Sequence, residues 1–220
     1  DGSALPAWLS FDAQTGALSG TPTNDDVGSV NVTVTTMDQG NLSASDTFAL
    51  TVTNVNDAPT VANAIADQTA VEDAPFSFQA PVDTFADVDA GDVLAYSALL
   101  ADGNALPTWL SFDAATGTFS GTPGNGDVGS VNVTVTATDQ DTLSAAGTFA
   151  LAVTNVNDAP TVALALVDQS MLEDVAFSFV VPADTFVDQD AGDTLVLSAS
   201  FEDGSALPAW LSFDAQTGAL

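Results

Sequence analysis

The chain has 220 residues, of which 46% are hydrophobic, and its 30 acidic residues are accompanied by no Lys, Arg or His, so that the formal net charge is −30. This charge repels nucleic acid and anionic lipid, and no apolar run reaches the roughly 18 residues of a membrane span, so we expect no nucleic-acid partner and no membrane insertion. Without His, Lys or Cys the chain lacks an ordinary general base near neutral pH, a thiol nucleophile and a disulfide, and we expect no enzyme.

The sequence repeats with a fixed period. Trp8, Trp109 and Trp210 are separated by 101 residues each, and residues 203–220 copy residues 1–18 without a change. A constant period of this length indicates an array of domains. We therefore divide the chain into the C-terminal part of one repeat at 1–57, a complete repeat at 58–157, and the N-terminal part of the next repeat at 158–220.

Within the complete repeat, short apolar stretches that often alternate with polar residues are separated by turn signals, which is the pattern of an antiparallel β-sandwich. The predicted strands, in chain order, are 60–64 with a continuation to 71, 76–80, 93–99, 109–112, 118–121, 131–138 and 148–155. Asp113 to Gly117 is predicted to form a tight turn, in which the Asp caps the backbone and the Gly supplies positive φ. The aromatic residues predicted to pack in cores are Trp8, Trp109, Trp210, Phe76, Phe78, Phe85, Phe112, Phe119 and Phe149.

If consecutive strands alternate in direction, the loops divide between two poles of the repeat. The pole beside the exit linker then collects Glu72, Asp73, Asp102 and Asp127, and the pole beside the entry linker collects Asp87, Asp89, Asp92, Asp139 and Asp141. Most acidic residues therefore meet at junctions between repeats. Because the chain has no cation of its own, these carboxylates must be solvated, hydrogen-bonded or bound to a foreign cation, for which Ca²⁺ with oxygen ligands is the candidate.

Three groups of residues are candidate calcium ligands. Alternate aspartates beside a glycine can wrap one Ca²⁺ in a loop, although a solvated Asp-rich turn has the same composition; they occur at Asp87, Asp89 and Asp92 and again at Asp188, Asp190 and Asp193. The two linkers add Asn54, Asn56 and Asp57, and Asn155, Asn157 and Asp158. Each linker is followed at a fixed distance by a Glu-Asp pair, Glu72–Asp73 and Glu173–Asp174. Glu is otherwise found only at position 202, which indicates that the longer carboxylate serves as a ligand.

An ordered set of short motifs covers the whole chain: Glu-Asp, Phe-x-Asp-x-Asp-x-Gly-Asp, Leu-Pro-x-Trp-Leu-Ser-Phe-Asp, Gly-Thr-Pro, Asp-Val-Gly-Ser, Thr-x-x-Asp and Asn-x-Asn-Asp-Ala-Pro. In this order they resemble the dystroglycan-type cadherin-like (putative Ig) repeat of very large bacterial surface and secreted proteins. The resemblance implies an all-β array of seven-stranded Greek-key β-sandwich modules with calcium between them. It implies ligands at the linker 155–160 from Glu72, Asp73, Asn155, Asn157, Asp158, Asp188 and Asp190, and at the linker 54–59 from Asn56, Asp57, Asp87, Asp89 and Asp139.

These observations favour a structural function: a calcium-rigidified array in an extracellular adhesin or filament, with neighbouring repeats as the immediate partners. One alternative is a self-assembling subunit whose incomplete ends complete the sandwiches of other copies by strand addition. Another is a glycan-binding module with an exposed aromatic platform, for which Tyr96 is the available residue. A surface glycan or protein ligand is also expected elsewhere in a full-length protein. A glycosidase needs two carboxylates across a cleft, and small repeated sandwiches offer no obvious cleft.

Overall fold

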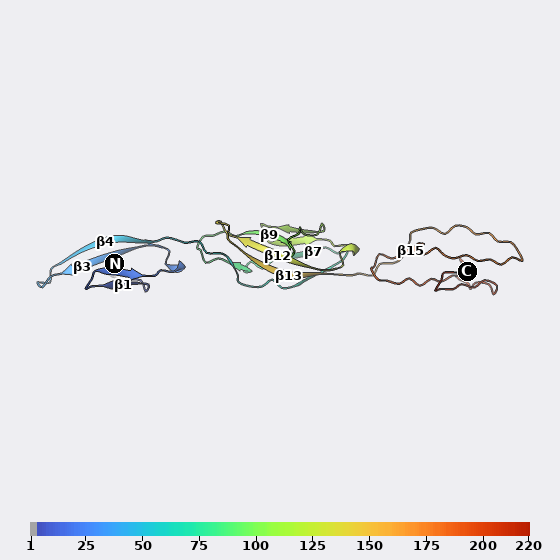
Figure 1. The fold of residues 1–220 in the computed structure, drawn as a ribbon, viewed down its shortest axis with the longest axis horizontal. Helices are drawn as coiled ribbons and strands as arrows, with labels where there is room; N and C mark the ends of the chain where they lie inside the picture. The colour runs from blue at the N-terminus through green and yellow to red at the C-terminus, as the bar shows by residue number, and fades with distance from the viewer. Residues whose placement is uncertain (1–3) are drawn as a thin grey trace.

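The computed structural model describes residues 4–220 and places three β-rich units in a line, which gives the chain an elongated shape (Figure 1). The first unit contains β1 (Leu9–Asp12), β2 (Ala17–Gly20), the 3-10 turn η1 (Asn24–Asp26), β3 (Gly28–Met37) and β4 (Ser43–Val52). The central unit contains β5 (Thr60–Val61), β6 (Gln68–Val71), β7 (Phe76–Gln79), β8 (Phe85–Ala86), β9 (Ala95–Leu100), β10 (Leu110–Asp113), β11 (Thr118–Gly121), the 3-10 turn η2 (Asn125–Asp127), β12 (Gly129–Thr138) and β13 (Ser144–Thr154). The third contains β14 (Thr161–Val162) and β15 (Phe186–Val187). Within residues 4–220 there is no helix with the length and hydropathy needed to cross a membrane.

The central unit is a β-sandwich of two main sheets. One sheet has the order β6-β13-β12-β9 and the other has the order β10-β11-β7, while β5 and β8 form a separate short pair. β6 and β13 are neighbours in the sheet although β7 to β12 lie between them in sequence. They pair in parallel. The architecture is therefore the all-β, cadherin-like sandwich that the sequence predicts.

The alternation of residues 131–138 explains how β12 faces the core. Val133, Val135 and Ala137 are buried, whereas Thr134 lies on the outer face, where its hydroxyl is 2.9 Å from that of Thr148 on β13. The buried side chains meet an aromatic cluster that joins the two sheets. Its central member, Phe119 on β11, lies with its ring 5.6 Å from that of Phe149 on β13 in an edge-to-face arrangement.

Two local features of the central unit follow from single residues. Asp113 accepts hydrogen bonds from the backbone N–H of Ala115 and from the hydroxyl of Thr116, and Gly117 has φ of 67°, so the predicted turn is confirmed. At Gly121, an added Cβ would collide with the backbone carbonyl oxygen of Trp109. The Gly-Thr-Pro motif therefore starts with glycine because two strands approach closely there.

The strand predictions need two corrections. The stretch 60–71 is not one strand but two, β5 and β6, because the chain leaves the sheet between them and buries only Ile65 of the intervening residues. The short strand β8 was not predicted, and it pairs with β5 rather than with a main sheet. The other predicted strands have counterparts whose ends differ by a few residues, the largest difference being β13, which begins at Ser144.

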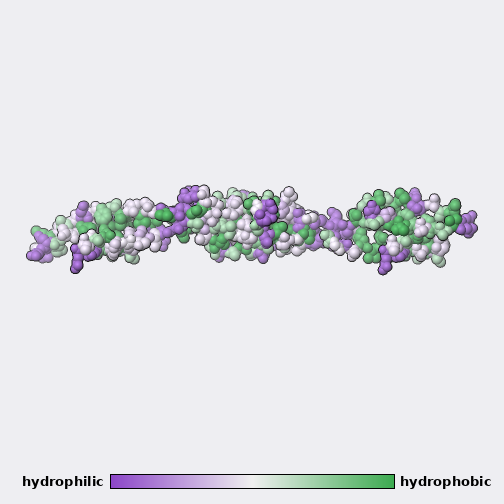
Figure 2. Space-filling model, in the orientation of Figure 1, coloured by the Kyte–Doolittle hydropathy of each residue, from purple (hydrophilic) through white to green (hydrophobic). Residues whose placement is uncertain are grey.

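The first and third units bury less apolar surface than the central one. Phe48 is 43% exposed, whereas the equivalent Phe149 is 3% exposed. The core prediction is wrong for Trp210, which is 68% exposed, while Trp109 packs on the core with its ring 6.3 Å from that of Phe76. The reason is that residues 158–220 contain no counterpart of the strands β12 and β13, on which the central core rests. Figure 2 shows apolar surface over the third unit and hydrophilic residues at the two connections.

Candidate metal centres

The linker 155–160 passes between a buried glutamate of the central repeat and an aspartate loop of the third. Glu72, Asp158 and Asp190 each offer a carboxylate oxygen, and these oxygens lie within 4.8 Å of one another. Glu72 is 1% exposed and Asp190 is 5% exposed. Three carboxylates from three separate segments are thus held together in a place that excludes most water.

Strand pairing places Glu72 in this cluster. It follows β6, which runs parallel to β13, and its backbone N–H donates to Thr154 at the end of β13 at 3.1 Å. The chain leaves β13 directly into the linker, where the N–H of Val156 donates to Glu72 Oε1. Glu72 therefore binds the linker backbone with one oxygen and has its second oxygen, Oε2, buried without a hydrogen-bond partner.

The aspartate loop of the third repeat curls so that its carboxylates converge. The N–H of Asp190 donates to Asp188 Oδ1 at 3.0 Å, and the N–H of Asp193 donates to the Asp190 carbonyl at 3.2 Å. Gly192 has φ of 102°, which a residue with a side chain adopts only under strain. The three aspartates form a second group within 4.8 Å, and Asp190 Oδ2 also accepts the backbone N–H of Asp158 at 2.7 Å.

The linker 54–59 meets an equivalent loop of the central repeat. Asp87, Asp89 and Asp92 lie within 4.8 Å of one another, and Asp89 Oδ2 accepts the backbone N–H of Asp57 at 2.6 Å. Asn56 donates its amide to Asp139 at 3.0 Å. Both linkers are therefore tied to the loop that follows them by the same bond, from the linker Asp N–H to the middle aspartate.

The carboxylates of these clusters repel one another and lack neutralising partners. Burial, followed by the charges of Asp87, Asp89, Asp139 and Asp141, raises the pKa of Asp92 above its usual range. Among residues 4–220, the buried carboxylate oxygens without a hydrogen bond are Glu72 Oε2, Asp87 Oδ2, Asp92 Oδ2 and Asp190 Oδ1, all in these clusters. Such oxygens are the hard ligands that Ca²⁺ prefers. The chain has no Lys, Arg or His that could neutralise these carboxylates instead of a cation.

Six of the candidate ligands lie outside the clusters. Asn54 and Asn155 are exposed, and Asn157 donates to the carbonyl oxygen of Asp158 in its own linker. Asp73 is in a left-handed turn with φ of 56° and is exposed. Glu173 and Asp174 are also exposed, and they lie after the linker of the third repeat, as Glu72 and Asp73 do in the central one.

The structure also identifies two junction residues that the sequence did not single out. Asn125 in η2 donates its side-chain amide to Asp158 at 2.6 Å, and Asn24 in η1 donates to Asp57 at 2.6 Å and to Asp89 at 3.4 Å. Each amide spans from the repeat before the linker to an acidic residue that is also a candidate ligand. The signal that could have revealed them is their recurrence at the same position of the 101-residue period.

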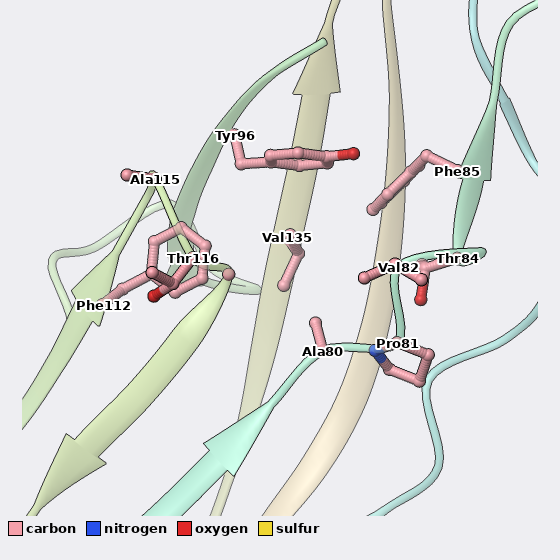
Figure 3. A pocket seen from close by; sticks show the side chains of 11 residues that line it. Ala80, Pro81, Val82, Thr84, Phe85, Tyr96, Phe112, Ala115, Thr116 and Val135 are labelled. Carbon is pink, nitrogen blue, oxygen red and sulfur yellow. The ribbon is translucent and has the colours of Figure 1, made fainter.

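The aromatic residue considered for glycan binding lies elsewhere. Tyr96 points into a cavity of about 140 Å³ between the two sheets, opposite Val135 and next to Phe85, whose ring is 6.0 Å away (Figure 3). The cavity is lined mainly by apolar side chains and contains no carboxylate. Tyr96 therefore forms part of an internal surface rather than a flat exposed platform on which a sugar ring could stack.

Comparisons with known proteins agree with this architecture. The chain matches the family model of the putative Ig domain over residues 1–53, 58–154 and 159–220. It is 34% identical over 150 residues to the serine-rich adhesin for platelets of Staphylococcus aureus, and the match covers 68% of this chain but 6% of that protein. The chain thus spans a small fraction of the length of such relatives.

Solved structures of cadherins have a similar fold. The chain superposes on protocadherin gammaB7 EC3-6 with a TM-score of 0.55 and 23% identity, over 98% of this chain and 58% of that one. It superposes on mouse cadherin-23 EC22-24 with a TM-score of 0.50 and 20% identity, over 68% of this chain and 50% of that one. At these identities the similarity concerns the fold alone.

Proposed function

Because the chain belongs to the putative Ig domain family, we propose that it forms part of a calcium-rigidified repeat array in an extracellular bacterial adhesin. The single observation that carries the proposal is the convergence of Glu72, Asp158 and Asp190, from two repeats and the linker between them. Two of their oxygens are buried without a partner, in a chain that has no basic residue. A divalent cation is the group that satisfies both conditions.

In this proposal calcium at the linker 155–160 is bound by residues of both adjoining repeats, and calcium at the linker 54–59 is bound by the linker and the central repeat. At the linker 155–160 the ligands are Glu72, Asp158, Asp188, Asp190 and Asp193, and at the linker 54–59 they are Asn56, Asp57, Asp87, Asp89, Asp92 and Asp139. Calcium takes six to eight oxygen ligands, so backbone carbonyls and water complete the set. The cation neutralises the carboxylates and joins the two repeats, and it thereby restricts changes in their relative orientation.

The first experiment is calorimetry of the chain with calcium and with a chelator. A ligand that binds the folded state alone adds about 2.7 kcal/mol at a hundredfold excess over its Kd. For a domain of about 100 residues, this raises the melting temperature by about 10–20 °C. Magnesium at the same concentration is the control and should raise the melting temperature less than calcium, because it gives up its water ligands reluctantly and demands a stricter geometry. Equal melting temperatures in calcium and chelator would contradict the proposal.

A further inference from the structure

We call the contacts at the linker 54–59 the first junction and those at the linker 155–160 the second junction. The second junction contains the one Asn-Gly pair of the chain, Asn125–Gly126. It lies in η2, at the end of the central repeat that faces the linker 155–160. The Asn125 side chain donates to Asp158 Oδ2 at 2.6 Å, so the pair is part of the contact between repeat and linker. We propose that Asn125–Gly126 is a spontaneous deamidation site that adds a carboxylate to this junction.

The reaction uses only the chain and water. The backbone nitrogen of Gly126 attacks Cγ of Asn125, a C–N bond forms, the bond from Cγ to Nδ2 breaks, and ammonia leaves with the proton from the Gly126 nitrogen. The five-membered succinimide then adds water at one of its two carbonyls. Opening there gives an aspartyl or an isoaspartyl residue at position 125, with one more negative charge and a mass increase of about 1 Da.

The local structure leaves the attacking nitrogen free. The backbone bonds of η2 are donated by Asp127 to Gly124 and by Val128 to Asn125, so the Gly126 N–H is not used in them. Gly126 is exposed, and a Cβ built on it would meet nothing within 4 Å. A residue without a side chain also has the widest choice of backbone angles, which the ring closure requires.

The first junction supplies an internal comparison. Asn24 occupies the equivalent position in η1 and makes the equivalent 2.6 Å bond, to Asp57. It is followed by Asp25, whose side chain restricts the backbone and crowds the ring closure, and it donates to a second carboxylate, that of Asp89. The two asparagines therefore share their structural role but not their reactivity.

Deamidation changes the contact from attractive to repulsive. An amide that donates to Asp158 is replaced by a carboxylate, which can only accept, so two negative charges face each other at hydrogen-bond distance. The isoaspartyl product also adds a carbon to the backbone of η2, next to the bond from the Gly124 N–H to Asp127. If calcium occupies the junction as proposed above, the new carboxylate becomes an additional ligand and the junction depends more strongly on the cation.

The test is incubation of the 220-residue chain at neutral pH, followed by proteolysis and mass spectrometry of the peptides that contain Asn125 and Asn24. We expect position 125 to gain about 1 Da at least about tenfold faster than position 24. The variant Gly126→Asp, which reproduces the Asn-Asp pair of the first junction, should reduce the rate at position 125 to that at position 24. Equal rates at the two positions in the wild-type chain would overturn the proposal.

A second measurement separates the modification from its consequence. The variant Asn125→Asp should melt below the wild type in chelator and show a larger rise on addition of calcium. An unchanged melting temperature in chelator would refute the repulsive contact, whatever the rates are. If neither chain responds to calcium while position 125 still deamidates first, the proposed calcium function fails and the deamidation site stands.

Discussion

The substitution Glu72→Gln should have opposite effects with and without calcium. In the metal-free chain, Glu72 is a buried carboxylate whose oxygen lies within 4.8 Å of those of Asp158 and Asp190. An uncharged side chain of the same shape removes this repulsion, so the variant should be more stable than the wild type in chelator. With calcium the variant lacks a ligand, so it should gain less stability than the wild type.

The magnitude follows from the geometry. At an effective dielectric constant of about 20, two unit charges 4.8 Å apart repel by about 3.5 kcal/mol. The substitution also weakens the hydrogen bond from the Val156 N–H by about 1 kcal/mol, because a charged acceptor becomes neutral. We therefore expect a net gain of about 2–3 kcal/mol in chelator from relief of one such repulsion. If the lost ligand weakens calcium binding a hundredfold, the calcium increment falls from about 2.7 to about 0.4 kcal/mol.

Calorimetry or circular-dichroism melting in calcium and in chelator measures both effects. The matched control is Glu173→Gln, because Glu173 occupies the same position of the 101-residue period but is exposed. This control should leave both melting temperatures unchanged. A Glu72→Gln variant that is destabilised in chelator and keeps the full calcium increment would show that Glu72 stabilises the linker only as a hydrogen-bond acceptor.

Three further predictions concern a titration and two packing contacts. Burial and neighbouring carboxylates raise the pKa of Asp92 above its ordinary value of 3.8, so the metal-free chain should lose stability through this group as the pH rises above 3.8. The variant Asp92→Asn should not show this loss, so the difference in melting temperature between wild type and variant should change with pH. A difference that does not vary with pH would contradict the prediction. Gly121→Ala should destabilise the central repeat by about 3 kcal/mol, because its Cβ meets a backbone carbonyl. Gly124→Ala, whose Cβ meets nothing within 4 Å, is the control, and equal urea midpoints for the two variants would refute the reasoning. Leu151→Ala should cost about 3–4 kcal/mol in urea denaturation, since Leu151 is fully buried, and more than Leu50→Ala, since the equivalent Leu50 is half-buried.

Local sequence patterns predicted the parts of the fold that depend on neighbouring residues. Asp113 with Gly117 identified the turn between β10 and β11, and the predicted strand 131–138 is part of β12, whose residues 133–138 alternate between buried and half-buried positions. The short strand β8 could not be predicted from its own residues, because it is defined only by its antiparallel pairing with β5. Such pairing depends on residues far away in sequence.

The same distinction explains the candidate site. The spacing of Asp87, Asp89 and Asp92 was sufficient to predict a converging loop, because those contacts are made within six residues. Asp73 was expected beside its neighbour Glu72, but a left-handed turn at Asp73 leaves its side chain exposed. Asn125 was missed because its partner, Asp158, is 33 residues away and amide donors carry no charge pattern.

The division of the proposed site at the linker 155–160 between two repeats determines what calcium could do there. Glu72 belongs to the repeat before the linker, Asp190 to the repeat after it, and Asp158 to the linker itself. An ion that holds all three is bound only while the two repeats keep one relative orientation. The free energy of binding is therefore also the free energy that opposes bending at that junction. If calcium binds at both junctions as proposed, the two sites fill independently, so stiffness should rise gradually as the calcium concentration passes its Kd and not in one cooperative transition.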